Sequence, residues 1–269
     1  CQTSDFGTVE HLSLPHQKIV SMKGIDSFIS LLSLNLDNNK IPSLTSLKHL
    51  RALESLSLRN NQISSLRGLE GLCSLKYANF SMNQLTQLKD SDFKHCKGLT
   101  ELDLAENPIR NFEGLWYLSE LDTLDLSYNQ NLKDFMGVPD LERLGKLKAE
   151  NCRVKNLKFV HSKFPSLNII NVKNNDITLY EEIEDIKKIE YLGKIFWFWM
   201  EVIFFIAELD IRYNPIEKMP AVQEMIVADV PDLEVYNQIE LLEPGYRYKV
   251  MNEEIKKYLE DTKDEEEEK

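Results

Sequence analysis

Apolar and polar positions along this chain follow an order that repeats about every 22 residues. Two successive stretches, LLSLNLDNNKIPSLTSLKHLRA from Leu31 and LESLSLRNNQISSLRGLEGLCS from Leu53, share the order L-x-x-L-x-L-x-x-N-x-I-x-x-L-x-x-L-x-x-L. The stretch LTELDLAENPIRNFEGLWYLSE repeats it with Phe112 in one leucine position. Nine copies align in this way, from VEHLSLPHQKI to ELDIRYNPI. Such an internal repeat is typical of a solenoid, in which each unit packs on its neighbours.

Each part of the repeat predicts a local structure. The L-x-L alternation has a period of two, so Leu34 and Leu36 are expected to point one way from a short strand and the polar residues between them the other way. From Ile41 to Leu53 apolar residues recur at every third position, which predicts a 3-10 turn or a short helix with one buried edge. We therefore expect an α/β solenoid: a curved, right-handed horseshoe with a parallel sheet on the concave side and 3-10 or short-helix segments on the convex side.

One column holds asparagine in almost every copy. Its side-chain amide follows the strand and can satisfy backbone groups that the turn leaves unpaired. The weak first copy has Gln17 here, and LGKLKAENCRV has a cysteine that we expect to be a buried structural thiol. Two copies are longer: the one ending SDFKHCKG by two residues, and the one containing NQNLKDF by one. The predicted ladder consists of Asn39, Asn61, Asn83, Asn107, Asn129, Cys152, Asn175 and Asn214.

These columns resemble those of the leucine-rich repeat family, in its short, roughly 22-residue intracellular class. The resemblance covers about residues 9–240. It predicts repeats over 9–219 and, because PIEKMPAVQEMIVADVPDLEVYNQIELL resembles the cap that closes this class, a C-terminal cap over 220–242. Residues 1–8 show no matching N-terminal cap, so we expect a truncated N-terminal segment. Residues 243–269 are expected to form a charged helix that passes into a disordered acidic tail.

An aromatic segment, GKIFWFWMEVIFFI at residues 193–206, interrupts the repeat. Without it, Leu192 would be followed by AELDIRYNPI and every apolar column would continue in order. The apolar run is shorter than the roughly 20 residues of a membrane span, and Glu201 interrupts it, so we expect no membrane insertion. Two interpretations stay open: a retained intron, whose edges can be encoded by donor-like and acceptor-like bases, or a hydrophobic loop that binds a partner.

Charge and cysteine content bear on the kind of partner and on the cellular compartment. The net charge of −12, part of it in the tail DTKDEEEEK, argues against nucleic-acid binding, which needs clustered lysine and arginine. The N-terminus shows no secretory signal. Cys1, Cys73, Cys96 and Cys152 lack the spacing of a disulfide-rich cap or a zinc site, which favours a reducing intracellular compartment. We expect a monomer in the cytoplasm, with the nucleus or cilium as alternatives.

No motif for catalysis stands out: a phosphate-binding glycine loop, a nucleophile elbow and metal-spaced His or Cys pairs are all missing from the sequence. We therefore expect no enzyme activity, no cofactor and no metal. The polar positions of the predicted strands are a better candidate, because a rigid, regularly spaced face suits recognition of a protein. An acidic middle beside a basic stretch would also orient the partner. The expected partner-binding residues are Asp37, Arg59, Tyr77, Glu101, Asp103, Asp125, Lys146, Lys148, Lys173, Asp210 and Arg212.

The resemblance also implies partners. The repeats are similar to those of the protein phosphatase 1 regulatory subunit type, which implies a phosphatase catalytic subunit as partner. Axonemal and ciliary repeat proteins share the repeat and cap, which implies dynein or tubulin components. Acidic nuclear repeat proteins share the acidic tail, which implies histones or other basic proteins. The sequence leaves all three open.

Overall fold

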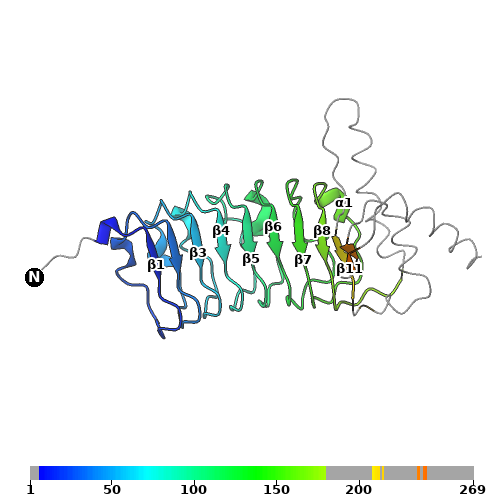
Figure 1. Cartoon of the computed structure of the whole chain (residues 1–269), viewed down its shortest axis with the longest axis horizontal. Helices are drawn as coiled ribbons and strands as arrows, with labels where there is room; N and C mark the ends of the chain where they lie inside the picture. The colour runs from blue at the N-terminus through cyan, green and yellow to red at the C-terminus, as the bar shows by residue number, and fades with distance from the viewer. Residues whose placement is uncertain (1–5, 180–207, 213, 215–234, 237–238, 241–269) are drawn as a thin grey trace, which may run out of the picture.

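The computed structural model describes residues 6–179, 208–212, 214, 235–236 and 239–240. The eleven strands within these residues form a single sheet whose spatial order is the sequence order. Successive strands are parallel from β1 to β10, and β11 is antiparallel to β10. Figure 1 shows β1 to β8 side by side along the long axis of an elongated molecule. The predicted solenoid with a parallel sheet is confirmed.

The strands are short and evenly spaced along the chain. They are β1 (His11–Ser13), β2 (Ser33–Asn35), β3 (Ser55–Ser57), β4 (Tyr77–Asn79), β5 (Glu101–Asp103), β6 (Thr123–Asp125), β7 (Lys146–Lys148), β8 (Ile169–Asn171), β9 (Glu208–Asp210), β10 (Val235–Tyr236) and β11 (Ile239–Glu240). The connections described contain the 3-10 helices η1 (Phe6–Thr8), η2 (Ile25–Ser27), η3 (Thr45–Leu47), η4 (Leu69–Gly71) and η5 (Glu113–Tyr117), and the α-helix α1 (Val160–Lys163). No described helix is long and apolar enough to cross a membrane.

The core is one continuous apolar column that runs through the repeats. The middle residue of each strand from β2 to β8 is buried, and so are the leucines and isoleucines that recur at every third position after the turn. Burying one such side chain fully stabilises the folded state by about 1.5–3 kcal/mol relative to leaving it exposed. These apolar positions therefore supply most of the free energy that stabilises each repeat. Four phenylalanines are fully buried in this core: Phe80, Phe93, Phe135 and Phe164. The rings of Phe135 and Phe164 meet edge to face, with their centroids 6.0 Å apart.

After each strand from β2 to β8, the third residue beyond the strand has a positive φ. Non-glycine residues occupy this position in all seven turns, and asparagine is the type that tolerates the conformation best. The position is held by Asn38, Asn60, Met82, Glu106, Tyr128, Asn151 and Asn174, with φ between 53° and 62°. The residue that follows is the ladder residue, whose side chain fastens the turn to the preceding repeat.

Asn83 shows how the ladder works. Its Nδ2 donates hydrogen bonds to the carbonyls of Leu58, Phe80 and Ser81 at 2.9, 3.0 and 3.1 Å. Its Oδ1 accepts one from the N–H of Ile63 in the preceding repeat at 2.9 Å. Buried amides thus replace water for backbone groups that lie between two repeats. The same pattern recurs at Asn39, Asn61, Asn107, Asn129, Asn175 and Asn214.

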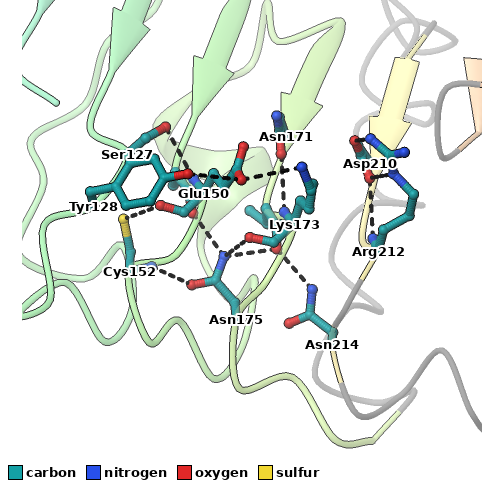
Figure 2. A network of polar contacts seen from close by, with 12 residues as sticks. Ser127, Tyr128, Glu150, Cys152, Asn171, Lys173, Asn175, Asp210, Arg212 and Asn214 are labelled. Atoms are coloured by element: carbon teal, nitrogen blue, oxygen red, sulfur yellow. Dashed lines mark hydrogen bonds and ion pairs between the residues drawn. The ribbon is translucent and has the colours of Figure 1, made fainter. Parts of the chain in front are cut away.

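Cys152 fits this ladder because of the extra residue in the repeat before it. Its Sγ lies 3.1 Å from the carbonyl of Leu126 and 3.3 Å from that of Glu150, so the thiol replaces the donating half of an asparagine (Figure 2). A thiol is a poor acceptor. The N–H that would need one, at Leu132, instead donates to the carbonyl of Asn129 at 3.0 Å, which the extra residue allows. Burial raises the pKa of the Cys152 thiol to about 12, so it stays protonated.

The register also continues across the aromatic interruption. β8 pairs directly with β9, and Asn214 Oδ1 accepts from the N–H of Ile177 at 3.1 Å, as a ladder neighbour should. These two residues are 37 apart in sequence, against 20 for the equivalent pair Ile63 and Asn83, so the connection holds 17 additional residues. Residues 193–206 lie outside the described residues, as do 243–269 and most of 220–242. Whether residues 193–206 are a retained intron or a partner-binding loop therefore stays an open prediction. The predicted domain boundaries also stay predictions.

Candidate protein-binding surface

Three columns of side chains cover the face of the sheet that points away from the core. The first column consists of the first residue of each strand, which the strand pairing places side by side: Ser33, Ser55, Tyr77, Glu101, Thr123, Lys146 and Ile169. The second column is the third residue of each strand: Asn35, Ser57, Asn79, Asp103, Asp125, Lys148, Asn171 and Asp210. The third column lies two residues further on: Asp37, Arg59, Ser81, Ala105, Ser127, Glu150, Lys173 and Arg212. All the residues predicted to bind a partner lie in these three columns.

The second column has a structural role that was not predicted. Wherever it holds asparagine or aspartate, the side-chain oxygen accepts a hydrogen bond from the backbone N–H two residues later, as in an Asx turn. At Asn35, Asn79, Asp103, Asp125, Asn171 and Asp210 these bonds are 2.9 to 3.1 Å long. The side chains of this column therefore help to hold the turn that follows each of these strands.

The acidic region lies on β5 and β6. Asp103 is directly beside Asp125 in the strand pairing, and Glu101 lies on the same strand as Asp103. Burial raises the pKa of the Asp103 carboxyl, and the negative charge of Asp125 raises it further. Asn79 Nδ2 donates to Asp103 Oδ2 at 3.0 Å, and Lys148 Nζ lies 3.4 Å from Asp125 Oδ2. Glu101 is exposed and forms no ion pair within the described part of the chain.

The basic region consists of Lys146, Lys148 and Lys173, and two of these lysines form ion pairs with carboxylates of the same face. Besides the pair of Lys148 with Asp125, Lys173 Nζ lies 3.3 Å from Glu150 Oε1 (Figure 2). Among the described residues Lys146 has no ion-pair partner, and its side chain is partly exposed. The expected basic patch is therefore centred on Lys146.

The two ends of the face differ from the middle. At the β2–β3 end, Asp37 accepts from Ser57 Oγ at 2.6 Å and from the N–H of Arg59 at 2.8 Å, while the side chain of Arg59 is exposed. At the β9 end, Arg212 Nη2 lies 2.8 Å from Asp210 Oδ2, and Asp210 is only 2% exposed. The buried Asp210 orients Arg212 and offers almost no surface of its own to a partner.

Tyr128 belongs to this surface and was missed from the sequence. It occupies the positive-φ position of its turn, with 43% of its surface exposed. Its hydroxyl donates to Glu150 Oε1 at 3.2 Å, and Figure 2 shows the ring lying toward Glu150 and Lys173. The negative charge of Glu150 raises the pKa of Tyr128. The sequence signal would have been an aromatic residue in a turn position otherwise held mainly by asparagine.

Tyr77 lies at the centre of the exposed part. It is on β4 beside Glu101 of β5, and Asn79 Nδ2 lies 3.4 Å from its hydroxyl. A half-exposed aromatic ring beside a free carboxylate is a common anchor at protein interfaces. In the described residues no group of three or more His, Cys, Asp or Glu side chains is arranged to hold a metal ion. The described side chains of this face offer a partner hydrogen-bonding groups, charges and aromatic surface.

Comparisons with known proteins agree with this architecture. The family described as "Leucine rich repeat" matches residues 73–130. No curated protein matches the sequence significantly. Among solved structures, an internalin, InlF of Listeria monocytogenes, is similar with a TM-score of 0.60 and 18% identity over 86% of this chain and 67% of its own. Internalin C2 of the same species has a TM-score of 0.56 and 26% identity over 66% of this chain and 76% of its own.

A third similar structure is the leucine-rich repeat domain of APL1B, with a TM-score of 0.64 and 20% identity. It aligns with 86% of this chain, which spans 65% of that structure. Because the sequence identities are low, these similarities are evidence for the fold alone. Residues 73–130 thus match the leucine-rich repeat family, and the described residues have the curved leucine-rich-repeat fold.

Proposed function

We propose that this chain is a non-catalytic scaffold that binds a protein partner on the polar face of its sheet. The observation that carries this proposal is a pair of opposite charges held in one column: Glu101 on β5 and Lys146 on β7, both without an ion pair among the described residues. Two strand spacings separate them, about 10 Å. Opposite charges fixed at this distance give a partner both attraction and a defined orientation.

The surrounding residues supply the rest of the contact surface. Tyr77 provides apolar area beside Glu101, and Arg59 provides an exposed guanidinium two strands away from β5. The remaining predicted residues, which are already paired within the chain, hold this surface rigid. Rigidity lowers the entropy lost on binding.

For the identity of the partner we propose a phosphatase catalytic subunit, because the repeats resemble those of the phosphatase regulatory subunit type. Components of the axoneme or cilium, and basic nuclear proteins, are the alternatives carried over from the same repeat class. Protein complexes are known for this fold: one structural neighbour is solved as the LRIM1/APL1C complex, with a TM-score of 0.59 and 19% identity over 85% of this chain and 39% of that one.

Site-specific photo-crosslinking tests the surface and the partner together. A photoreactive phenylalanine would replace Tyr77 on the sheet in one variant and Trp116 in another; Trp116 lies on η5 and is 62% exposed. We expect a partner crosslinked from position 77 and none from position 116 when each variant is expressed in its native cells. Mass spectrometry of the adduct then distinguishes a phosphatase catalytic subunit from tubulin, dynein or histones.

Charge variants provide the matched control. Glu101→Lys and Lys146→Glu should each reduce recovery of the crosslinked partner, because each replaces an attraction by a repulsion. Glu113→Lys makes the same charge change on η5, away from the sheet, and should leave recovery unchanged. Crosslinks from position 116 alone, or equal losses for Glu101→Lys and Glu113→Lys, would contradict binding on the sheet face.

A further inference from the structure

An open pocket of about 450 Å³ lies on the opposite side from the polar face, where η3 and η4 stack on each other. Its charged lining consists of Lys48, Arg51 and Arg67 against Glu70, with His49 beside them. With histidine neutral, three positive charges and one negative charge leave a local charge of +2, whereas the whole chain carries −12. The pocket is therefore a basic site on an acidic protein.

Two glycines create this pocket. Gly68 has a φ of 123°, and a Cβ added to it would lie 2.2 Å from the carbonyl oxygen of Leu44. A Cβ added to Gly71 would lie 1.6 Å from the carbonyl oxygen of Lys48. The backbones of the two turns are thus in direct contact, which only residues without side chains allow. This contact brings the basic side chains of two successive repeats around one opening.

None of the three positive side chains of the pocket forms an ion pair within the described structure. Ion pairs form elsewhere among the described residues, and none involves Lys48, Arg51 or Arg67. The one carboxylate of the lining belongs to Glu70, whose Oε2 accepts a hydrogen bond from the N–H of Gly68 at 2.7 Å. Like charges held together in this way favour an anionic ligand.

The exposure of the pocket decides what kind of anion fits. All three cationic side chains are exposed, and a single exposed ion pair contributes little free energy. Several carboxylates must therefore engage at once, which a small inorganic anion cannot offer and a run of acidic residues can. The chain itself contains such a run, DEEEE at residues 264–268, which lies outside the described residues.

The length of the connecting chain is sufficient for this segment to reach the pocket. Eight strand spacings separate β3, which lies between η3 and η4 in the chain, from β11, about 38 Å at 4.8 Å each. The chain between residues 240 and 264 can extend to about 80 Å. We propose that the acidic segment 264–268 of this chain binds in the basic pocket between η3 and η4 of the same molecule. Binding there leaves the polar face of the sheet uncovered, so this contact is independent of the proposed partner site.

Zero-length crosslinking with a carbodiimide tests the contact in the full chain, because it joins a lysine amine to a carboxylate only when the two are in contact. We expect a crosslink from Lys48 to residues 264–268 in the monomer fraction. The pair of Lys76 and Glu54, whose charged atoms lie 2.9 Å apart, gives an internal reference for the yield. About 0.5 M salt shortens the screening length to about 4 Å and should suppress the Lys48 crosslink.

Variants separate specific docking from nonspecific attraction. Arg51→Gln with Arg67→Gln keeps Lys48 as the reporter and should lower its crosslink yield about fivefold relative to the reference. Lys94→Gln with Arg110→Gln removes the same charge from exposed positions outside the pocket and should leave the yield unchanged. Equal losses in both variants, a missing Lys48 crosslink while the reference forms, or a crosslink confined to dimers would each overturn the proposal. The last result would make a second copy the occupant.

Discussion

Replacing Asn83 by alanine tests the idea that the ladder amides serve backbone groups of the neighbouring repeat. The N–H of Ile63 donates to Asn83 Oδ1 at 2.9 Å, and Ile63 is fully buried. Alanine leaves this N–H without an acceptor in a place that water cannot reach. A buried orphan of this kind costs about 1–3 kcal/mol.

The carbonyl side of the change costs less, because the ladder is redundant. The carbonyl of Leu58 keeps a bond from Asn61 Nδ2 at 3.1 Å, and that of Phe80 keeps one from Asn107 Nδ2 at 3.0 Å. These carbonyls are not left unpaired, so each lost hydrogen bond costs only its net contribution to the free energy of unfolding, about 0.5–1.5 kcal/mol. Together with the orphaned N–H, we expect Asn83→Ala to lower the free energy of unfolding by about 3 kcal/mol.

Cys152→Ala is the matched comparison in the same column. The N–H of Leu132 is already bonded to the carbonyl of Asn129, and the carbonyl of Leu126 keeps a bond from Asn129 Nδ2 at 2.8 Å. No backbone group is orphaned, so the loss is limited to the weak thiol bonds and a small cavity, about 1–2 kcal/mol. The difference between the two variants isolates the accepting half of the ladder side chain.

Urea unfolding followed by far-ultraviolet circular dichroism gives the change in midpoint and slope for both variants. Because a solenoid can open repeat by repeat, amide hydrogen exchange should be measured as well. We expect the Ile63 amide to lose protection in Asn83→Ala more than its neighbours do. Equal destabilisation by the two variants, or an unchanged exchange rate at Ile63, would refute the reasoning.

Three further outcomes follow from close packing and burial. Gly71→Ala should lower the melting temperature markedly, since its Cβ would meet a carbonyl of the preceding repeat at 1.6 Å, whereas Gly98→Ala, with open space around it, should change little. Of the cysteines that the structure describes, Cys73 is exposed and should react with a thiol reagent at pH 8 in the native state; Cys96 and Cys152 should react only after unfolding, because burial raises the pKa of each thiol to about 12. Stability should also fall as pH rises from about 9 toward 12, because unfolded thiols lose protons that the folded ones keep; urea midpoints that do not fall above pH 9 would contradict this assignment.

The repeat by itself determined the architecture of this protein. A period of two at Leu34 and Leu36, followed by a period of three from Ile41 onward, specifies which side chains are buried without reference to any distant residue. The same register identifies the ladder column and the three polar columns, because stacking copies of one unit leaves little freedom in how they align. The register even continues correctly to Asn214 after the interruption.

The tertiary structure decided how the polar residues are used. Whether Lys148 is free or paired depends on the distance to Asp125 in the adjacent strand, and no local pattern encodes that distance. The tolerance for Cys152 depends on an N–H in another repeat that finds its own acceptor. The basic pocket exists because Gly71 lets two backbones touch. Periodicity is a property of one unit, whereas pairing, satisfaction of hydrogen bonds and close approach belong to the contact between units.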